Sequence, residues 1–168
     1  IWFLWVGCLS VTACGGDTRG RPVPEGSCGT GDPILEIGAL DPFEPRPNGD
    51  FIVAQGFQGG HHIDVSIRVR GEMDPVHTDI ELVLRDGERE LARHGVADWL
   101  LYPDSEGNFC DYPRARLVLV DGEGGLLPVE AIPDLINIPM ELTARMSSVP
   151  AAVERVFGIR LTSIRSLE

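Results

Sequence analysis

Residues 61–70 read HHIDVSIRVR, and they carry the clearest strand pattern in the chain. From the third position onward, apolar and polar side chains alternate without exception. Successive side chains of a strand point to opposite faces of a sheet. The apolar side chains share one face and are Ile63, Val65, Ile67 and Val69. The other face carries His62, Asp64, Ser66, Arg68 and Arg70. This pattern predicts a strand with one buried face and one face in contact with water.

Alternation and turn residues on either side of this segment predict further strands. Residues 78–85 alternate in the same way, and the pair Asp86-Gly87 is typical of a turn into a second strand at 88–93. Residues 140–147 and 152–164 predict a hairpin at the end of the chain, with a short helix at 151–156 as the alternative. Additional strands are predicted at 34–40, 51–58 and 114–120.

These segments amount to about seven or eight short strands within residues 33–168, a number typical of an antiparallel two-sheet sandwich. The sequence therefore predicts an all-β domain of immunoglobulin-like architecture. The Cys-Trp-Cys core pattern of antibody domains is absent, so only the broad architecture is expected. No repeat, coiled coil or second domain is predicted.

The charge of the chain excludes several classes of function. The formal net charge is −12, and a surface this acidic repels phosphate backbones, so nucleic-acid binding is not expected. All 14 basic residues are arginines. The absence of lysine excludes a Schiff base and a phosphate-loop lysine. No serine elbow, zinc-binding helix motif or phosphate-cradling glycine loop is present, so we expect neither an enzyme nor a cofactor.

The chain opens with an uncharged apolar run, IWFLWVGCLSVTA, at residues 1–13. Such a run has the length of a signal-peptide core and is shorter than the roughly 20 residues that span a bilayer. No methionine or basic segment precedes Ile1, so we expect a signal peptide that is truncated at its start.

The run ends in Val11-Thr12-Ala13-Cys14, which resembles the lipobox of bacterial lipoproteins. The resemblance implies that Cys14 carries lipid, that the preceding peptide bond is cut, and that the acyl chains anchor the protein in a membrane. An ordinary signal peptide or a buried strand ending in cysteine is the alternative. Gly15 replaces the aspartate of an inner-membrane retention signal, which favours the outer membrane of the cell envelope. Residues 14–32 are then the lipidated cysteine and a flexible Gly- and Pro-rich tether.

The remaining cysteines predict a disulfide. Cys8 leaves with the leader and Cys14 is assigned to lipid, so Cys28 and Cys110 are left as an even pair in an oxidising compartment. A bridge between them would tie the start of the domain to the loop near Asn108 and would make a cysteine nucleophile unavailable.

Residues 56–62, GFQGGHH, lead into the strand at 61–70. They resemble a Gly-x-Gln-Gly-Gly-x-His segment of uncharacterised secreted bacterial lipoproteins, in which a strand carrying an arginine follows; Arg68 corresponds to that arginine. The resemblance implies no known activity. Paired glycines permit positive φ, and an amide can satisfy loop backbone groups. We therefore expect a structural corner made by Gly56, Gln58, Gly59, Gly60 and His61.

A metal site at this corner is the alternative to a structural role. His61 and His62 are adjacent and so point to opposite faces, whereas His62 and Asp64 share a face. Parity places His61 toward the core, where its ring needs a partner, and His62 on the polar, exposed face. His77 and His94 stand at no diagnostic spacing. The acidic loop 98–111 is a further candidate, for calcium, although its spacing departs from the EF-hand pattern.

The sequence thus favours a lipid-anchored envelope protein with a non-catalytic binding or structural β domain. Its expected partners are the membrane, through the lipid, and an envelope protein or a polysaccharide. The alternative is a metal-binding or metal-dependent envelope protein that uses the corner at His61 and His62. The fold class does not separate these two functions, because sandwiches host both.

Overall fold

The computed structural model describes residues 28–39, 42–56, 59–104, 106–149 and 151–165. The leader, Cys14 and Gln58 lie outside these residues. Two short 3-10 helices, Val129–Ala131 and Pro133–Leu135, accompany the strands. The strands are β1 (Ile34–Ala39), β2 (Glu44–Pro45), β3 (Asp50–Gln55), β4 (His61–Arg70), β5 (Thr78–Asp86), β6 (Arg89–Trp99), β7 (Tyr102–Pro103), β8 (Cys110–Val118), β9 (Pro139–Ser147) and β10 (Ala152–Arg165).

The structure confirms the all-β prediction. Strand β4 covers the segment with the strict alternation, and β5 and β6 form the predicted antiparallel hairpin. The terminal hairpin is formed by β9 and β10, which pair antiparallel from Ala152 with Ser147 to Arg160 with Pro139. The helix considered for residues 151–156 is therefore wrong, because residues 152–156 pair with β9.

Hydrogen bonds join the ten described strands into one continuous sheet rather than two. Along one path the order is β2-β1-β4-β3-β10-β9-β5-β6, and β8 with β7 branches from β4. All pairs are antiparallel except β3 with β10, which run parallel. The antiparallel immunoglobulin-like two-sheet sandwich is thus not confirmed. Periodicity predicts which face of a strand is buried, but it does not predict which distant strand becomes its neighbour.

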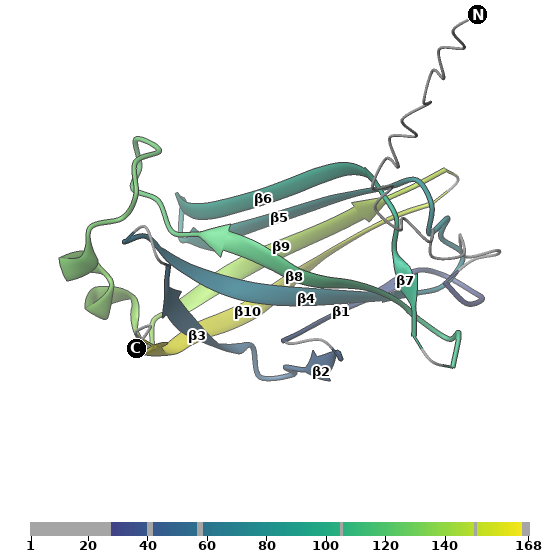
Figure 1. Ribbon diagram of the computed structural model, residues 1–168, viewed down its shortest axis with the longest axis horizontal. Helices are drawn as coiled ribbons and strands as arrows, with labels where there is room; N and C mark the ends of the chain where they lie inside the picture. Colours follow the sequence, from purple (N-terminus) through teal and green to yellow (C-terminus); the bar gives the residue numbers. More distant parts are fainter. Residues whose placement is uncertain (1–27, 40–41, 57–58, 105, 150, 166–168) are drawn as a thin grey trace, which may run out of the picture.

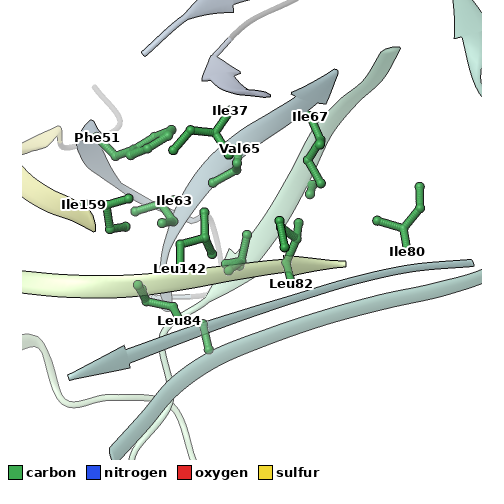
Figure 2. Packing of buried hydrophobic residues seen from close by; sticks show 14 of the residues in the cluster. Ile37, Phe51, Ile63, Val65, Ile67, Ile80, Leu82, Leu84, Leu142 and Ile159 are labelled. Carbon is green, nitrogen blue, oxygen red and sulfur yellow. The ribbon is translucent and has the colours of Figure 1, made fainter. Parts of the chain in front are cut away.

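The sheet folds back on itself around a single core. Figure 1 shows β4 and β8 crossing in front of β9 and β10. Figure 2 shows Ile63 and Val65 of β4 packed toward Leu82 of β5 and Leu142 of β9. Each such fully buried side chain contributes about 1.5–3 kcal/mol relative to exposure. The inward face of β4 is therefore the apolar one, as its alternation predicts.

The edges of the folded sheet meet where β6 approaches β8. The backbone N–H of Val120, just after β8, donates to the carbonyl of Leu91 in β6 at 2.8 Å. Nearby, Nε2 of His94 lies 2.7 Å from the hydroxyl of Tyr112. Burial lowers the pKa of His94 and raises that of Tyr112, so both groups are neutral near pH 7.

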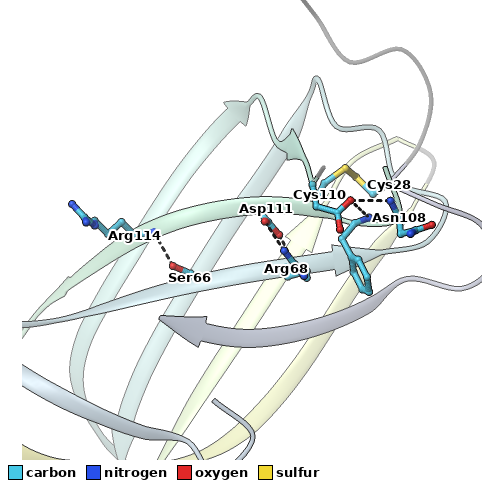
Figure 3. Close-up of polar contacts among 9 residues, drawn as sticks. Cys28, Ser66, Arg68, Asn108, Cys110, Asp111 and Arg114 are labelled. Atoms are coloured by element: carbon cyan, nitrogen blue, oxygen red, sulfur yellow. Dashed lines mark hydrogen bonds and ion pairs between the residues drawn. A yellow bond between two sulfur atoms is a disulfide. The ribbon is translucent and has the colours of Figure 1, made fainter. Parts of the chain in front are cut away.

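The predicted disulfide pair comes together at the opposite end of β4 from the histidines. The sulfur atoms of Cys28 and Cys110 are 2.11 Å apart (Figure 3), and the two residues are separated by 82 positions in the sequence. Cys28 is buried, and its N–H donates to the carbonyl of Met73 at 3.3 Å. Cys28 is therefore part of the packed domain, although it lies inside the stretch 14–32 that the sequence predicts to be tether.

Beside the disulfide, Arg68 donates two hydrogen bonds to Asp111, at 2.6 and 2.8 Å (Figure 3). Its guanidinium carbon also lies 4.4 Å from the ring centroid of Phe43 and 4.8 Å from that of Phe109. A bidentate pair whose guanidinium also contacts two aromatic rings has little freedom. The arginine singled out in the sequence is thus engaged in holding the end of β4.

Candidate functional site

The glycine corner between β3 and β4 is a tight turn. The N–H of Gly56 donates to the carbonyl of Gly60 at 2.7 Å, and the N–H of Gly59 donates to that of Gly56 at 3.0 Å. Gly59 has a φ of 84°, which an L-residue with a side chain rarely adopts. The turn starts β4 at His61 and so decides which face each histidine takes.

The two histidines point to opposite faces, but both are buried. His61 is 3% exposed, and its Nδ1 has no hydrogen-bond partner among the described residues. His62 is 8% exposed, so the prediction that it lies exposed on the polar face is wrong. Its register partners, Ala54 of β3 and Val118 of β8, flank it on both sides. Cross-strand neighbours on one face lie about 5 Å apart, and so they shield the imidazole between them.

His62 lies in the wall of a cavity of about 390 Å³ on the outer face of β3, β4 and β8. On one side of β4, β1 pairs with Ser66–Arg70 and β3 pairs only with His61 and His62. The cavity lies where β1 and β3 diverge. Its lining is Ala39, Arg46, Asp50, Phe51, Ile52, Ala54, Gln55, Gly56, His62, Asp64, Arg114, Arg116 and Arg165. We call it the arginine pocket.

The charge of the arginine pocket is opposite to that of the whole chain. Four arginines and two aspartates line it, which leaves two positive charges in excess. The chain carries a formal net charge of −12. Burial, followed by the charge of Arg116, lowers the pKa of His62, and the nearby Asp64 only partly opposes this. The imidazole is therefore neutral near pH 7 and adds no charge to the lining.

Two of the four arginines are paired with acids. Nε of Arg116 lies 3.2 Å from Oδ1 of Asp64, and a terminal nitrogen of Arg46 lies 2.9 Å from Oε2 of Glu44. Nε of Arg46, however, is buried without a hydrogen-bond partner among the described residues. The guanidinium groups of Arg114 and Arg165 have no acidic partner within the described part of the chain. Donors able to bind an anion therefore remain in the lining.

Arg114 projects from a β-bulge in β8. Tyr112 faces Ile67 and Ala115 faces Val65, so Pro113 and Arg114 together stand opposite Ser66. The N–H of Arg114 donates to the Ser66 hydroxyl at 3.3 Å (Figure 3), and the φ of Arg114 is 60°. The bulge lets Tyr112 and Ala115 both face the core while Arg114 points outward. A non-glycine residue in this conformation costs about 1–3 kcal/mol, and such outliers concentrate at functional sites.

The geometry gives little support to a metal site at the corner. Nε2 of His62 and Oδ1 of Asp64 are 3.8 Å apart, and His61 points to the other face. Among the described residues, no group of three or more His, Cys, Asp or Glu side chains is placed to hold a metal ion. His77 pairs with Asp98 and His94 with Tyr112, away from the corner.

In the acidic loop 98–111, Oδ1 of Asp104 accepts a hydrogen bond from the N–H of Asn108 at 3.0 Å and a longer one, at 3.4 Å, from that of Phe109. This carboxylate closes a turn within the loop. The described contacts lend no support to the calcium alternative for this loop.

Sequence reasoning missed the arginines of the pocket. Arg46 follows β2, Arg114 and Arg116 lie in β8, and Arg165 ends β10, so no local motif groups all four. One available signal was the Tyr112-Pro113-Arg114 step, because a proline inside a strand often marks a bulge.

Within the described residues, no helix is long and apolar enough to cross a membrane. A scan against protein-family models gave no match, and neither the curated protein sequences nor the solved structures gave a significant match. The function must therefore be argued from the site itself.

Proposed function

We propose that this chain is a lipid-anchored protein of the bacterial cell envelope whose β domain binds a ligand without chemical catalysis. The observation that carries the binding role is the arginine pocket, a cavity with two excess positive charges in a chain of net charge −12. A concave site with a few polar groups of one charge is a common form of ligand site.

The anchoring part of the proposal rests on the sequence. The lipobox-like Val11-Thr12-Ala13-Cys14 places the lipid at Cys14, ahead of the disulfide at Cys28. A structural disulfide also fits an exported protein, because cytosolic thiols are kept reduced. On this proposal, the folded-over sheet is a sandwich-like scaffold that holds the binding site outside the membrane.

The position of the pocket fits such an arrangement. Cys28 forms an isolated backbone β-bridge with Gly71 at one end of β4, and His62 lies near the other end. Arg70 lies eight positions after His62 in β4, a span of about 26 Å at roughly 3.3 Å per residue. The arginine pocket therefore lies away from the end at which the anchored segment enters the domain.

Acyl labelling in a bacterial host with lipoprotein processing tests the anchoring. We expect the full-length chain to incorporate labelled palmitate and to sediment with membranes, and we expect the Cys14→Ser variant to lose both properties. Cys28→Ser serves as the matched control, since it removes a cysteine but leaves the lipobox intact. Equal labelling of Cys14→Ser and the wild type would refute the assignment.

A metal-handling function is the second candidate. Its support is the 3.8 Å approach of His62 and Asp64, which supplies two donors, whereas protein zinc sites use three or four. We therefore favour the binding domain.

A further inference from the structure

We propose that the arginine pocket binds a small organic anion with about two negative charges, carried by phosphate or carboxylate groups next to an uncharged part. This inference rests on the proposed function only in using the same cavity. It does not depend on lipid anchoring.

The charge of the ligand follows from the lining. Two positive charges in excess are balanced by two negative charges on a ligand. Guanidinium groups present planar, forked donors that match the two oxygens of a carboxylate or a phosphate. Lysine would bind such groups as a point charge, but the chain contains none.

The free donors are placed on both sides of the cavity. Arg114 lies on β8 and Arg165 on β10, with β3 and β4 between them. Three steps between neighbouring strands, each about 4.8 Å, put strands β8 and β10 roughly 14 Å apart. Because both side chains line one cavity of about 390 Å³, a small ligand between them has a guanidinium group on either side.

A third donor without a partner in the described part of the chain, Nε of Arg46, belongs to a residue that directly follows β2. Nε of Arg46 is buried and unpaired among the described residues, although the same guanidinium already binds Glu44. Buried donors are nearly always satisfied in folded proteins. An oxygen atom of a bound anion would supply the missing acceptor.

The floor between these donors is less polar. Ala54 and Ile52 of β3 lie in the lining, and Ala54 is the register partner of both His62 and Arg165. The neutral His62 offers one hydrogen-bond donor or acceptor there. This floor suits the uncharged part of an organic anion better than it suits a free inorganic ion.

Isothermal titration of the full-length chain in a non-ionic detergent tests the proposal. The probes are inorganic phosphate, glucose 6-phosphate, succinate and, as the uncharged reference, glucose. We expect saturable binding of glucose 6-phosphate or succinate that weakens as salt rises, weaker binding of phosphate, and none of glucose. The stronger of the two organic anions identifies a phosphate ester or a carboxylate as the source of the charge.

Substitutions then locate the site. We expect Arg114→Gln and Arg165→Gln each to weaken binding about tenfold, as loss of a charge-assisted hydrogen bond does. Arg89→Gln is the matched control, because it removes one charge from the exposed β5–β6 hairpin, outside the pocket, and should change the affinity less than twofold. Circular dichroism checks that every variant is folded.

The proposal is overturned if no organic anion binds saturably below about 10 mM. It is also overturned if Arg89→Gln weakens binding as much as Arg114→Gln and Arg165→Gln do. Neither result bears on the palmitate labelling of Cys14, and a failure of that labelling leaves anion binding unaffected. The two failures are therefore distinguishable.

Discussion

Arg116 and Asp64 form an ion pair across β8 and β4, with Nε 3.2 Å from Oδ1, and this pair stands beside an arginine that has no such partner. Arg114, two residues earlier on β8, lines the same cavity and contacts no carboxylate among the described residues. Asp64 neutralises the charge of Arg116, whereas the charge of Arg114, in the bulge, remains available to an anion. This difference is the basis for assigning anion binding to the pocket.

The strained backbone at Arg114 predicts an unusual order of stabilities. We expect Arg114→Gly to be more stable than Arg114→Ala by about 1 kcal/mol, because glycine adopts a φ of 60° without steric cost. At Arg116, which lies in regular strand, the order should reverse by about 0.5–1 kcal/mol. Denaturant unfolding of the four variants measures both differences. Alanine equal to or better than glycine at position 114 would contradict the assigned conformation.

The unpaired ring nitrogen of His61 predicts that an apolar side chain can replace it. His61→Ala should lower the free energy of unfolding by about 1–3 kcal/mol through lost packing. His61→Leu fills most of the space and removes the unpaired ring nitrogen, so it should come within about 0.5 kcal/mol of the wild type or exceed it. Fluorescence of Trp99 can follow the unfolding. If leucine costs as much as alanine, the ring has a partner that the described contacts lack.

The lowered pKa of His62 predicts a loss of stability on acidification. Its pKa lies below the ordinary value of 6.5, so the unfolded state binds the proton more readily. Stability is therefore intact above pH 6.5 and falls as the pH drops through 6.5 toward the lower folded-state pKa. Thermal unfolding of the wild type and His62→Gln between about pH 7.5 and about pH 5 measures this. The pKa of His94 is also lowered, so His94 contributes to the loss of stability on acidification, and the His62→Gln variant retains that contribution.

The variant should consequently lose less stability than the wild type over the same interval. Identical pH profiles for the two proteins would show that His62 is not protonated more readily on unfolding.

The metal alternative makes a contrasting prediction about thermal stability. A ligand that binds the folded state raises the midpoint of unfolding. With only His62 and Asp64 as neighbouring donors, we expect zinc and copper to leave the midpoint unchanged. A clear rise that disappears in His62→Ala would favour the metal function, whereas a rise that persists in His62→Ala would place the metal elsewhere.

The bridge between Cys28 and Cys110 should contribute strongly to stability. Its sequence separation of 82 corresponds to about 4.5 kcal/mol in the chain-entropy treatment. Mass mapping of non-reduced peptides should recover the linked pair, and Cys110→Ala should unfold at lower denaturant. Two alkylatable thiols in the folded protein would disprove the bridge.

Several features of the fold follow from local sequence alone. The alternation at 61–70 predicts β4 and its buried face, and Asp86-Gly87 predicts the β5–β6 hairpin. Elimination among the cysteines predicts the partner of Cys28. Each of these depends on residues close in the chain or on a choice among very few candidates.

Other features depend on distant neighbours and could not be predicted. His62 is on the polar face, as parity requires, but Ala54 and Val118 enclose it there. The parallel pairing of β3 with β10 joins segments about a hundred residues apart. The pattern of apolar residues within a strand does not indicate which distant strand it pairs with. The same long-range pairings bring the lining of the arginine pocket together. Its residues therefore cannot be identified as a group before the strand order is known.

The most direct test of the central claim is to observe the arginines of the pocket while an anion binds. In two-dimensional NMR spectra of the arginine Nε–H groups, addition of glucose 6-phosphate or succinate should shift the signals of Arg46, Arg114 and Arg165 saturably and at one common affinity. The signal of Arg89, outside the pocket, should remain in place. Equal small shifts spread over all exposed arginines, or no shift at Arg114 and Arg165, would contradict the account.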